Sequence, residues 1–140
     1  MVKAAVTRRQ TRTPDAAPHG RSAVRKLHVL TYNIHKGFSQ FSARMMIHEL
    51  RRRLHGLNPD IVFLQEVQGL HEGHAERHLD WPEAGQHDFL AEGVWPDTAY
   101  GGNAIYDHGH HGNAILSRFP ILSSHNQDIS ELRFERRGML

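Results

Sequence analysis

Two polar residues follow short apolar runs, at places where a folded chain could build a chemical site. Asn33 comes directly after Leu-Thr-Tyr at 30–32, and Glu66 comes after Phe-Leu-Gln at 63–65. Open α/β sheets bind ligands at the carboxyl ends of their strands, where a buried carboxylate is costly unless it is paired or metal-bound. One carboxylate beside a neutral amide suits Mg²⁺, a hard ion that keeps most of its water. A purely structural role is equally open, in which Glu66 ends a strand at the surface and Asn33 forms a turn.

The thirteen histidines are the second candidate for chemistry. One group, spaced i, i+3, i+7, would share one face of a short helix over 71–79: His71, His74 and His78. A second group shares one glycine-flanked turn: Asp107, His108, His110 and His111. Because imidazole suits Zn²⁺ and Ni²⁺, a histidine-rich Zn²⁺ or Ni²⁺-binding module is an alternative to an enzyme. The same histidines could instead be ordinary surface residues, or belong to loops that line a substrate cleft.

The elements that would position Asn33 and Glu66 form a strand–helix–strand unit. The alternating segment 27–33 predicts a strand, and a helix follows from a cap at Ser42 to about Leu57, with apolar residues at helical spacing. Pro59 stops that helix. The continuous apolar run at 61–64 is typical of a strand buried on both faces, closed by Gln-Glu at 65–66. Whether the two strands are direct neighbours stays open at this point.

The rest of the chain predicts shorter elements. No clear period marks residues 86–95. In chain order, we expect strands over 103–106 and 112–117 joined by a turn at 107–111, a third strand over 121–124 and another from 134 onward.

Charge is distributed unevenly along the 140 residues. Residues 1–26 hold seven Lys or Arg and one Asp, whereas residues 27–140 hold ten basic and fourteen acidic residues. We expect the first segment to be a disordered basic arm, because it has no hydrophobic period, and the second to form one domain. The lack of cysteine excludes disulfides and thiol chemistry. No apolar run approaches the ~20 residues of a membrane helix, and the arm lacks the apolar core of a secretory signal, so we expect a cytoplasmic protein without a transmembrane segment.

Three segments resemble, in order and spacing, the first three motifs of the endonuclease/exonuclease/phosphatase superfamily. They are Leu-Thr-Tyr-Asn-Ile-His-Lys-Gly at 30–37, Asp-Ile-Val-Phe-Leu-Gln-Glu-Val at 60–67 and Gly-Asn-Ala-Ile-Leu-Ser-Arg-Phe-Pro-Ile at 112–121. The resemblance covers residues 27–140 and is strongest to a bacterial branch with the Asn-Ile-His-Lys-Gly form of the first motif. It implies a DNase I-like, four-layer α/β sandwich, of which we expect this chain to form only the N-terminal half.

The resemblance also implies a function and a set of site residues. The superfamily includes DNase I-like nucleases, abasic-site endonucleases, neutral sphingomyelinases and inositol-polyphosphate phosphatases. It implies hydrolysis of a phosphodiester or phosphomonoester with Mg²⁺, or with Mn²⁺ in its place. Glu66 would be a metal ligand, Asn33 would position the metal or a phosphate oxygen, and His35 would lie near the metal. Asn113 and Ser117 match a mainly structural motif. The substrate would be nucleic acid, a lipid headgroup or a small phosphate ester, and the oligomeric state stays open.

Two later motifs of the superfamily have no counterpart in this sequence. No Gly-Asp-x-Asn occurs, and the single Asp-His, at 107–108, precedes the third motif instead of following it. The family uses such an Asp-His to activate the attacking water. We therefore expect this chain by itself to be nearly inactive, and a non-catalytic interaction module or relic is a further alternative.

Overall fold

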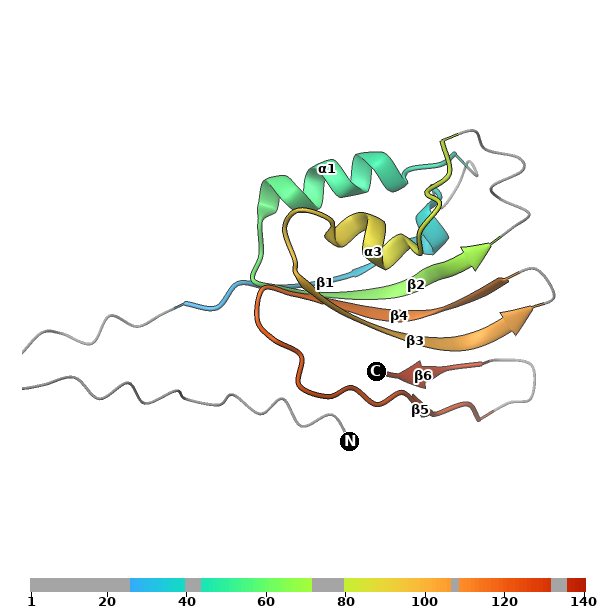
Figure 1. Ribbon diagram of the computed structural model, residues 1–140. Helices are drawn as coiled ribbons and strands as arrows, with labels where there is room; N and C mark the ends of the chain where they lie inside the picture. Colours follow the sequence, from blue (N-terminus) through green and yellow to red (C-terminus); the bar gives the residue numbers. More distant parts are fainter. Residues whose placement is uncertain (1–25, 40–43, 72–79, 107–108, 132–135) are drawn as a thin grey trace, which may run out of the picture.

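The computed structural model describes residues 26–39, 44–71, 80–106, 109–131 and 136–140. Almost all of the predicted basic arm, residues 1–25, lies outside this part of the chain. Two helices cover one face of a four-stranded sheet, and a two-stranded ribbon lies on the other side (Figure 1). The helices are α1 (Ile47–Leu57) and α3 (Gln86–Ala91). The strands of the sheet are β1 (Val29–Asn33), β2 (Ile61–His71), β3 (Asp97–Tyr106) and β4 (Gly109–Ser117), in the order β1-β2-β4-β3.

The strand–helix–strand unit forms as predicted, and its two strands are direct neighbours. β1 and β2 pair in parallel, from Val29 opposite Ile61 to Asn33 opposite Gln65. The connecting helix α1 ends at Leu57 because Asn58 takes a left-handed conformation, with φ 51°, and donates its backbone N–H to the carbonyl of Leu54. The helix begins at Ile47, later than predicted. Ser42, the predicted cap, lies outside the described residues, and Met45 just before the helix forms a β-bridge with Phe38.

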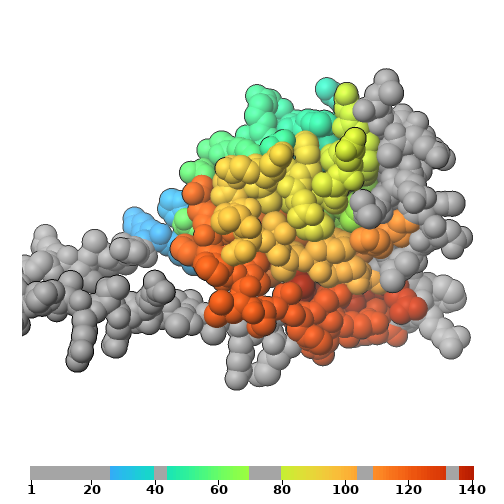
Figure 2. Space-filling view, viewed as in Figure 1, coloured from blue at the N-terminus to red at the C-terminus, as the bar shows by residue number. Residues whose placement is uncertain are grey.

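The hydrophobic core lies between the helices and the sheet, where α1, α3, β2 and β4 contribute fully buried side chains. The two helices are joined by polar contacts as well. His55 of α1 hydrogen-bonds the carbonyl of Leu90 at 2.9 Å, and Arg51 pairs with Glu92 at 2.8 Å. Figure 2 shows this helical layer, in green and yellow, on the opposite side of the sheet from the C-terminal segment in red. The core includes Ile47, Leu54, Val62, Leu64, Leu90 and Leu116.

The prediction that 61–64 is buried on both faces was wrong. Val62 and Leu64 point into the helical layer and are fully buried, whereas Phe63 points to the opposite face and remains 41% exposed. The reason is that the helices cover only one face of the sheet, while the ribbon on the other face lies against β3 and β4. An apolar run therefore appears in a strand that is buried on one face.

The predicted hairpin is confirmed, but its strands are longer than expected. β3 and β4 pair antiparallel as far as Tyr106 opposite Gly109, so that only residues 107–108, outside the described residues, separate the two strands. His110 and His111 consequently lie in β4 and not in a histidine-rich turn. His71 is the last residue of β2, so the helix predicted from residue 71 does not begin there, and residues 72–79 lie outside the described chain.

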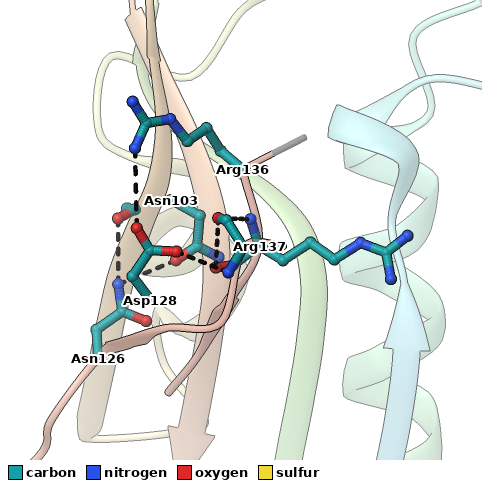
Figure 3. Close-up of polar contacts among 7 residues, drawn as sticks. Asn103, Asn126, Asp128, Arg136 and Arg137 are labelled. Carbon is teal, nitrogen blue, oxygen red and sulfur yellow. Dashed lines mark hydrogen bonds and ion pairs between the residues drawn. The ribbon is translucent and has the colours of Figure 1, made fainter. Parts of the chain in front are cut away.

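The segment after β4 differs from the prediction. Residues 121–124 are irregular and form no strand. Instead, β5 (Gln127–Asp128) pairs with β6 (Gly138–Met139), within the segment where a strand from 134 onward was expected. Figure 3 shows polar side chains that join this ribbon to the sheet: Nδ2 of Asn126 donates to Oδ1 of Asn103 at 3.0 Å. Helix α3 was not predicted at all, because its six residues are too few to show a clear period.

No helix among the described residues is long and apolar enough to cross a membrane.

Candidate functional site

Asn33 and Glu66 lie together at one end of the β1–β2 pair. Nδ2 of Asn33 donates a hydrogen bond of 2.8 Å to Oε1 of Glu66. The parallel register explains this contact, because Asn33, the last residue of β1, is paired with Gln65 in β2. The backbone N–H of Ile34 then donates to the carbonyl of Gln65 at 3.0 Å, so the first residue after β1 still follows the edge of β2. Local strand pairing thus brings an amide and a carboxylate together from positions 33 residues apart.

The sequence predicted that Glu66 closes its strand, and this prediction was wrong. β2 continues to His71, and its pairing with β4 shifts register between Leu64 and Val67, which is a β-bulge at Gln65 and Glu66. Glu66 has a φ of 53°, in the left-handed region that non-glycine residues rarely adopt. Bulges change the direction of a side chain and are frequent next to active sites. The bulge therefore turns the Glu66 carboxylate toward the end of β1 from within a longer strand.

His35 fixes the orientation of the Asn33 side chain. The backbone N–H of His35 donates to Oδ1 of Asn33 at 2.9 Å. Since only the amide oxygen can accept this bond, the NH₂ group must face the Glu66 carboxylate, as observed. Nδ1 of His35 lies 3.8 Å from Oε2 of Glu66, and both side chains are about 40% exposed, at 38% and 42%. The structure thus brings the three predicted site residues into one partly exposed group.

The turn that carries His35 has an uncommon backbone. It is a single 3-10 turn, η1 (His35–Gly37), in which His35, Lys36 and Gly37 have φ values of 47°, 59° and 80°. Gly37 is required here for a second reason besides its positive φ. A Cβ at this position would lie 2.4 Å from Nε2 of the buried Gln86. The first motif therefore ends in glycine because the turn packs directly against helix α3.

Two further residues share the electrostatic environment of Glu66. Burial lowers the pKa of His111 from its usual value, the positive charge of Lys36 lowers it further, and the Glu66 carboxylate opposes both effects. His111 lies in β4 opposite Gln68, two residues after Glu66. Its imidazole therefore takes up a proton less readily than an ordinary histidine does, and it lies within electrostatic range of both charges. Nothing in the isolated sequence separated His111 from the other histidines, since the strand register alone brings it here.

The donor set at Glu66 fits a hard divalent cation. Within the described ranges, no group of three His, Cys, Asp or Glu side chains forms a ready-made metal site. Zn²⁺ usually needs three or four such protein ligands, whereas Mg²⁺ commonly binds through one or two carboxylates and keeps several waters. A single, partly exposed and oriented carboxylate is therefore suited to Mg²⁺ or Mn²⁺.

The histidine-rich metal module stays a prediction. Most of the histidines on which it depended lie outside the described side chains, namely His71, His74, His78 and His108. His110 is engaged elsewhere, because its Nδ1 is 2.9 Å from the hydroxyl of Tyr100. Asn113 and Ser117, expected to be structural, make contacts within the fold. Nδ2 of Asn113 donates to the carbonyl of Gly138 at 2.7 Å, and Oγ of Ser117 accepts from the backbone N–H of Phe119 at 3.0 Å.

The fold and the order of its elements define an α/β protein with a polar site where β1 ends beside the bulge of β2. Comparison with known proteins identifies the class. The family model "Endonuclease/Exonuclease/phosphatase family" matches residues 30–138. The chain belongs to this family, as the three motifs indicated. The description of this family names endonucleases, exonucleases and phosphatases.

Curated relatives and solved structures agree with this assignment. The uncharacterized protein YbhP of Escherichia coli K12 is 50% identical over 112 residues, which are 80% of this chain and 44% of YbhP, and YbhP of Shigella flexneri matches equally. The chain thus spans less than half the length of these relatives.

Two solved structures show the fold. An endonuclease/exonuclease/phosphatase from Beutenbergia cavernae DSM 12333 superposes with a TM-score of 0.63 at 22% identity, over 80% of this chain and 32% of that one. An endonuclease/exonuclease/phosphatase family protein from Leptotrichia buccalis C-1013-b superposes with a TM-score of 0.55 at 14% identity, over 81% of this chain and 47% of that one. The predicted α/β fold of this family is therefore confirmed, and the described residues contribute a helical layer, one sheet and a short ribbon.

Proposed function

We propose that this chain carries part of the active site of a divalent-metal-dependent phosphoesterase. Glu66 is the metal ligand, Asn33 orients it, and His35 completes the group. The observation that carries the proposal is the 2.8 Å hydrogen bond from Asn33 to Glu66, formed between the end of β1 and the bulge of β2 in a chain of this family. The metal is Mg²⁺ or Mn²⁺, and the substrate class is a phosphoester of nucleic acid, a lipid headgroup or a small molecule.

The contacts of Glu66 divide its two oxygens between different tasks. Oε1 accepts from Asn33, which holds the carboxylate in one orientation, while Oε2 faces His35 at the longer distance of 3.8 Å. A bound divalent cation would supply stabilisation of the negative charge that develops on the phosphoryl oxygens. A pre-oriented ligand loses little side-chain entropy when it binds, so the Asn33 contact favours binding.

Asn33 has a second task in this proposal. One N–H of its amide is used by Glu66, and the other can donate to a phosphoryl oxygen placed beside the metal ligand. The nearby positive charge of Lys36, which acts on His111 electrostatically, favours the approach of an anionic ester from the same side.

Metal binding by Glu66 can be tested without turnover. In the 140-residue chain, we expect Glu66→Gln to abolish specific Mn²⁺ binding measured by electron paramagnetic resonance, because the amide keeps the shape but removes the charge. Glu131→Gln makes the same charge change at an exposed position and should bind Mn²⁺ like the wild type. Mn²⁺ binding by Glu66→Gln that equals the binding of the Glu131→Gln control would contradict the proposal.

A further inference from the structure

The side chain of Gln86 lies between the two segments that build the candidate site. It is 1% exposed, and both ends of its amide are used. Nε2 donates to the carbonyl of Lys36 at 2.8 Å, and Oε1 accepts from the backbone N–H of Gln68 at 2.9 Å. Lys36 belongs to the η1 turn that follows Asn33, and Gln68 lies two residues after Glu66 in β2. One buried amide therefore connects the two segments on which the proposed site depends.

The edge of β2 requires such a partner. β1 ends at Asn33, opposite Gln65, whereas β2 continues to His71. After the bond from Ile34 to Gln65, β1 provides no further backbone groups along this edge. A buried backbone N–H without an acceptor is strongly unfavourable. Gln86 supplies the acceptor for the Gln68 N–H at the position where a longer β1 would have supplied a carbonyl.

The η1 turn requires support as well. His35 and Lys36 both have positive φ, a conformation that is unfavourable for L-residues. This backbone therefore persists only where its surroundings hold it. Two side-chain amides do so here. Asn33 accepts from the N–H of His35, and Gln86 donates to the carbonyl of Lys36. The N–H of His35 orients the Asn33 side chain, and the amide of Gln86 holds the next residue of that turn, Lys36.

We propose that Gln86 is a positioning residue of this site: its amide holds the η1 turn against the bulged part of β2, so that Asn33 meets Glu66. Its consequence for metal binding rests on the proposed function, whereas its effect on the Asn33–Glu66 hydrogen bond does not. The opposing view is that Gln86 only adds stability to helix α3, in which case any equal loss of stability in α3 would have the same effect on the site.

The test compares Gln86→Met with Leu90→Val in the full 140-residue chain. Methionine keeps the length of the side chain but removes both hydrogen bonds. Leu90 is fully buried in the same helix, and its truncation loosens α3 without changing the Gln86 amide. Two quantities are measured by NMR: the hydrogen-exchange rate of the Asn33 side-chain amide, and the Mn²⁺ concentration that broadens its signal. Thermal unfolding gives the stability of each variant.

We expect Gln86→Met to speed exchange of the Asn33 amide and to raise the Mn²⁺ dissociation constant, each at least tenfold. Leu90→Val should change both less than twofold, although it also lowers the melting temperature. If the wild type binds Mn²⁺ and Gln86→Met binds equally, the inference is wrong and the proposed function stands. If the wild type does not bind Mn²⁺, the proposed function fails. The exchange rates then decide the inference alone, and equal rates in the two variants overturn it.

Discussion

At the scale of single residues, the most informative feature is the backbone of Glu66. Its φ of 53° lies in the left-handed region, where the Cβ of an L-residue costs about 1–2 kcal/mol relative to glycine. The bulge that requires this conformation also turns the carboxylate toward Asn33. Strained backbone is concentrated at functional sites, where the geometry matters more than local stability. Glu66 thus keeps an unfavourable backbone at the point where its carboxylate meets Asn33.

This backbone gives a prediction that separates strain from chemistry. Glu66→Gly and Glu66→Ala both remove the carboxylate, but only alanine keeps a Cβ in the left-handed region. We expect the glycine variant to have a free energy of unfolding about 1 kcal/mol higher than the alanine variant, measured by urea denaturation.

The control is an ordinary strand position. Ala114 is buried in β4, and Ala114→Gly should lower the free energy of unfolding, because glycine weakens a strand interior. A Glu66→Ala variant as stable as Glu66→Gly would show that residue 66 does not adopt a left-handed conformation in solution.

At the scale of elements, helix α3 joins the site to a half-buried aromatic cluster. Next to Gln86, the His87 ring stacks on Tyr100 with centroids 4.8 Å apart and an interplanar angle of 11°. The Tyr100 hydroxyl is in turn 2.9 Å from Nδ1 of His110, and burial raises the pKa of Tyr100 to about 12. Burial lowers the pKa of His87, His110 lowers it slightly further, and the Asp88 carboxylate opposes this. The helix thus stacks a histidine that resists protonation on Tyr100 of β3.

The lowered pKa of His87 predicts how stability depends on pH. Unfolded histidine takes up a proton near pH 6.5, whereas folded His87 does so only at lower pH. The unfolded state therefore binds more protons as the pH falls below about 6.5, and stability that is present above that pH is lost. Phenylalanine keeps a ring on Tyr100 but does not titrate. We expect His87→Phe to lose less stability between pH 7 and pH 5 than the wild type, as measured by urea denaturation at each pH.

A control variant is available at an exposed histidine. His125→Phe should lose as much stability over this pH range as the wild type does, because His125 is exposed. Parallel pH curves for His87→Phe and the wild type would mean that His87 does not contribute to the acid sensitivity of the fold.

At the scale of the whole molecule, the two faces of the sheet differ in their cover. The helical layer buries one face, while the opposite face of β1 and β2 presents exposed apolar side chains, including Val29 at 53%. The candidate site lies where β1 ends beside the bulge of β2. The chain spans 44% of YbhP.

We expect the 140-residue chain by itself to be a poor catalyst. No Asp-His follows β4 in the sequence, and a general base typically contributes about 10²–10⁴-fold to such a reaction. With Mg²⁺ and bis(p-nitrophenyl) phosphate, we expect the wild type and Glu66→Gln to release p-nitrophenol at the same background rate.

A chimera provides the positive comparison. Joining residues 1–140 to the unmatched part of YbhP tests the same argument, because a base supplied by that part should raise the Mg²⁺-dependent rate about 100-fold or more. Rapid turnover by the 140-residue chain, lost in Glu66→Gln, would show that a base already lies within it.

Several features could be predicted from local sequence patterns, because each of them depends mainly on residues within one element or in adjacent elements. Alternation and helical spacing report which side chains are buried, so they located β1, most of α1 and the β3–β4 hairpin. The order of three motifs identified the family. Asn33 was placed correctly as the last residue of its strand, because a polar residue and a glycine-containing loop follow an apolar run. The roles assigned to Asn33, Glu66 and His35 stay predictions.

The sequence by itself determined the family, the main elements and the three candidate residues, whereas the tertiary structure decided how those residues meet. Gln65 and Glu66 form a bulge only because β2 continues along β4, and Phe63 is exposed only because the helices cover a single face. Gln86 reaches Lys36 and Gln68 across 50 and 18 residues of chain. Such contacts depend on the register of strands and the packing of layers, which arise when distant segments share one core, so no local period of the sequence records them.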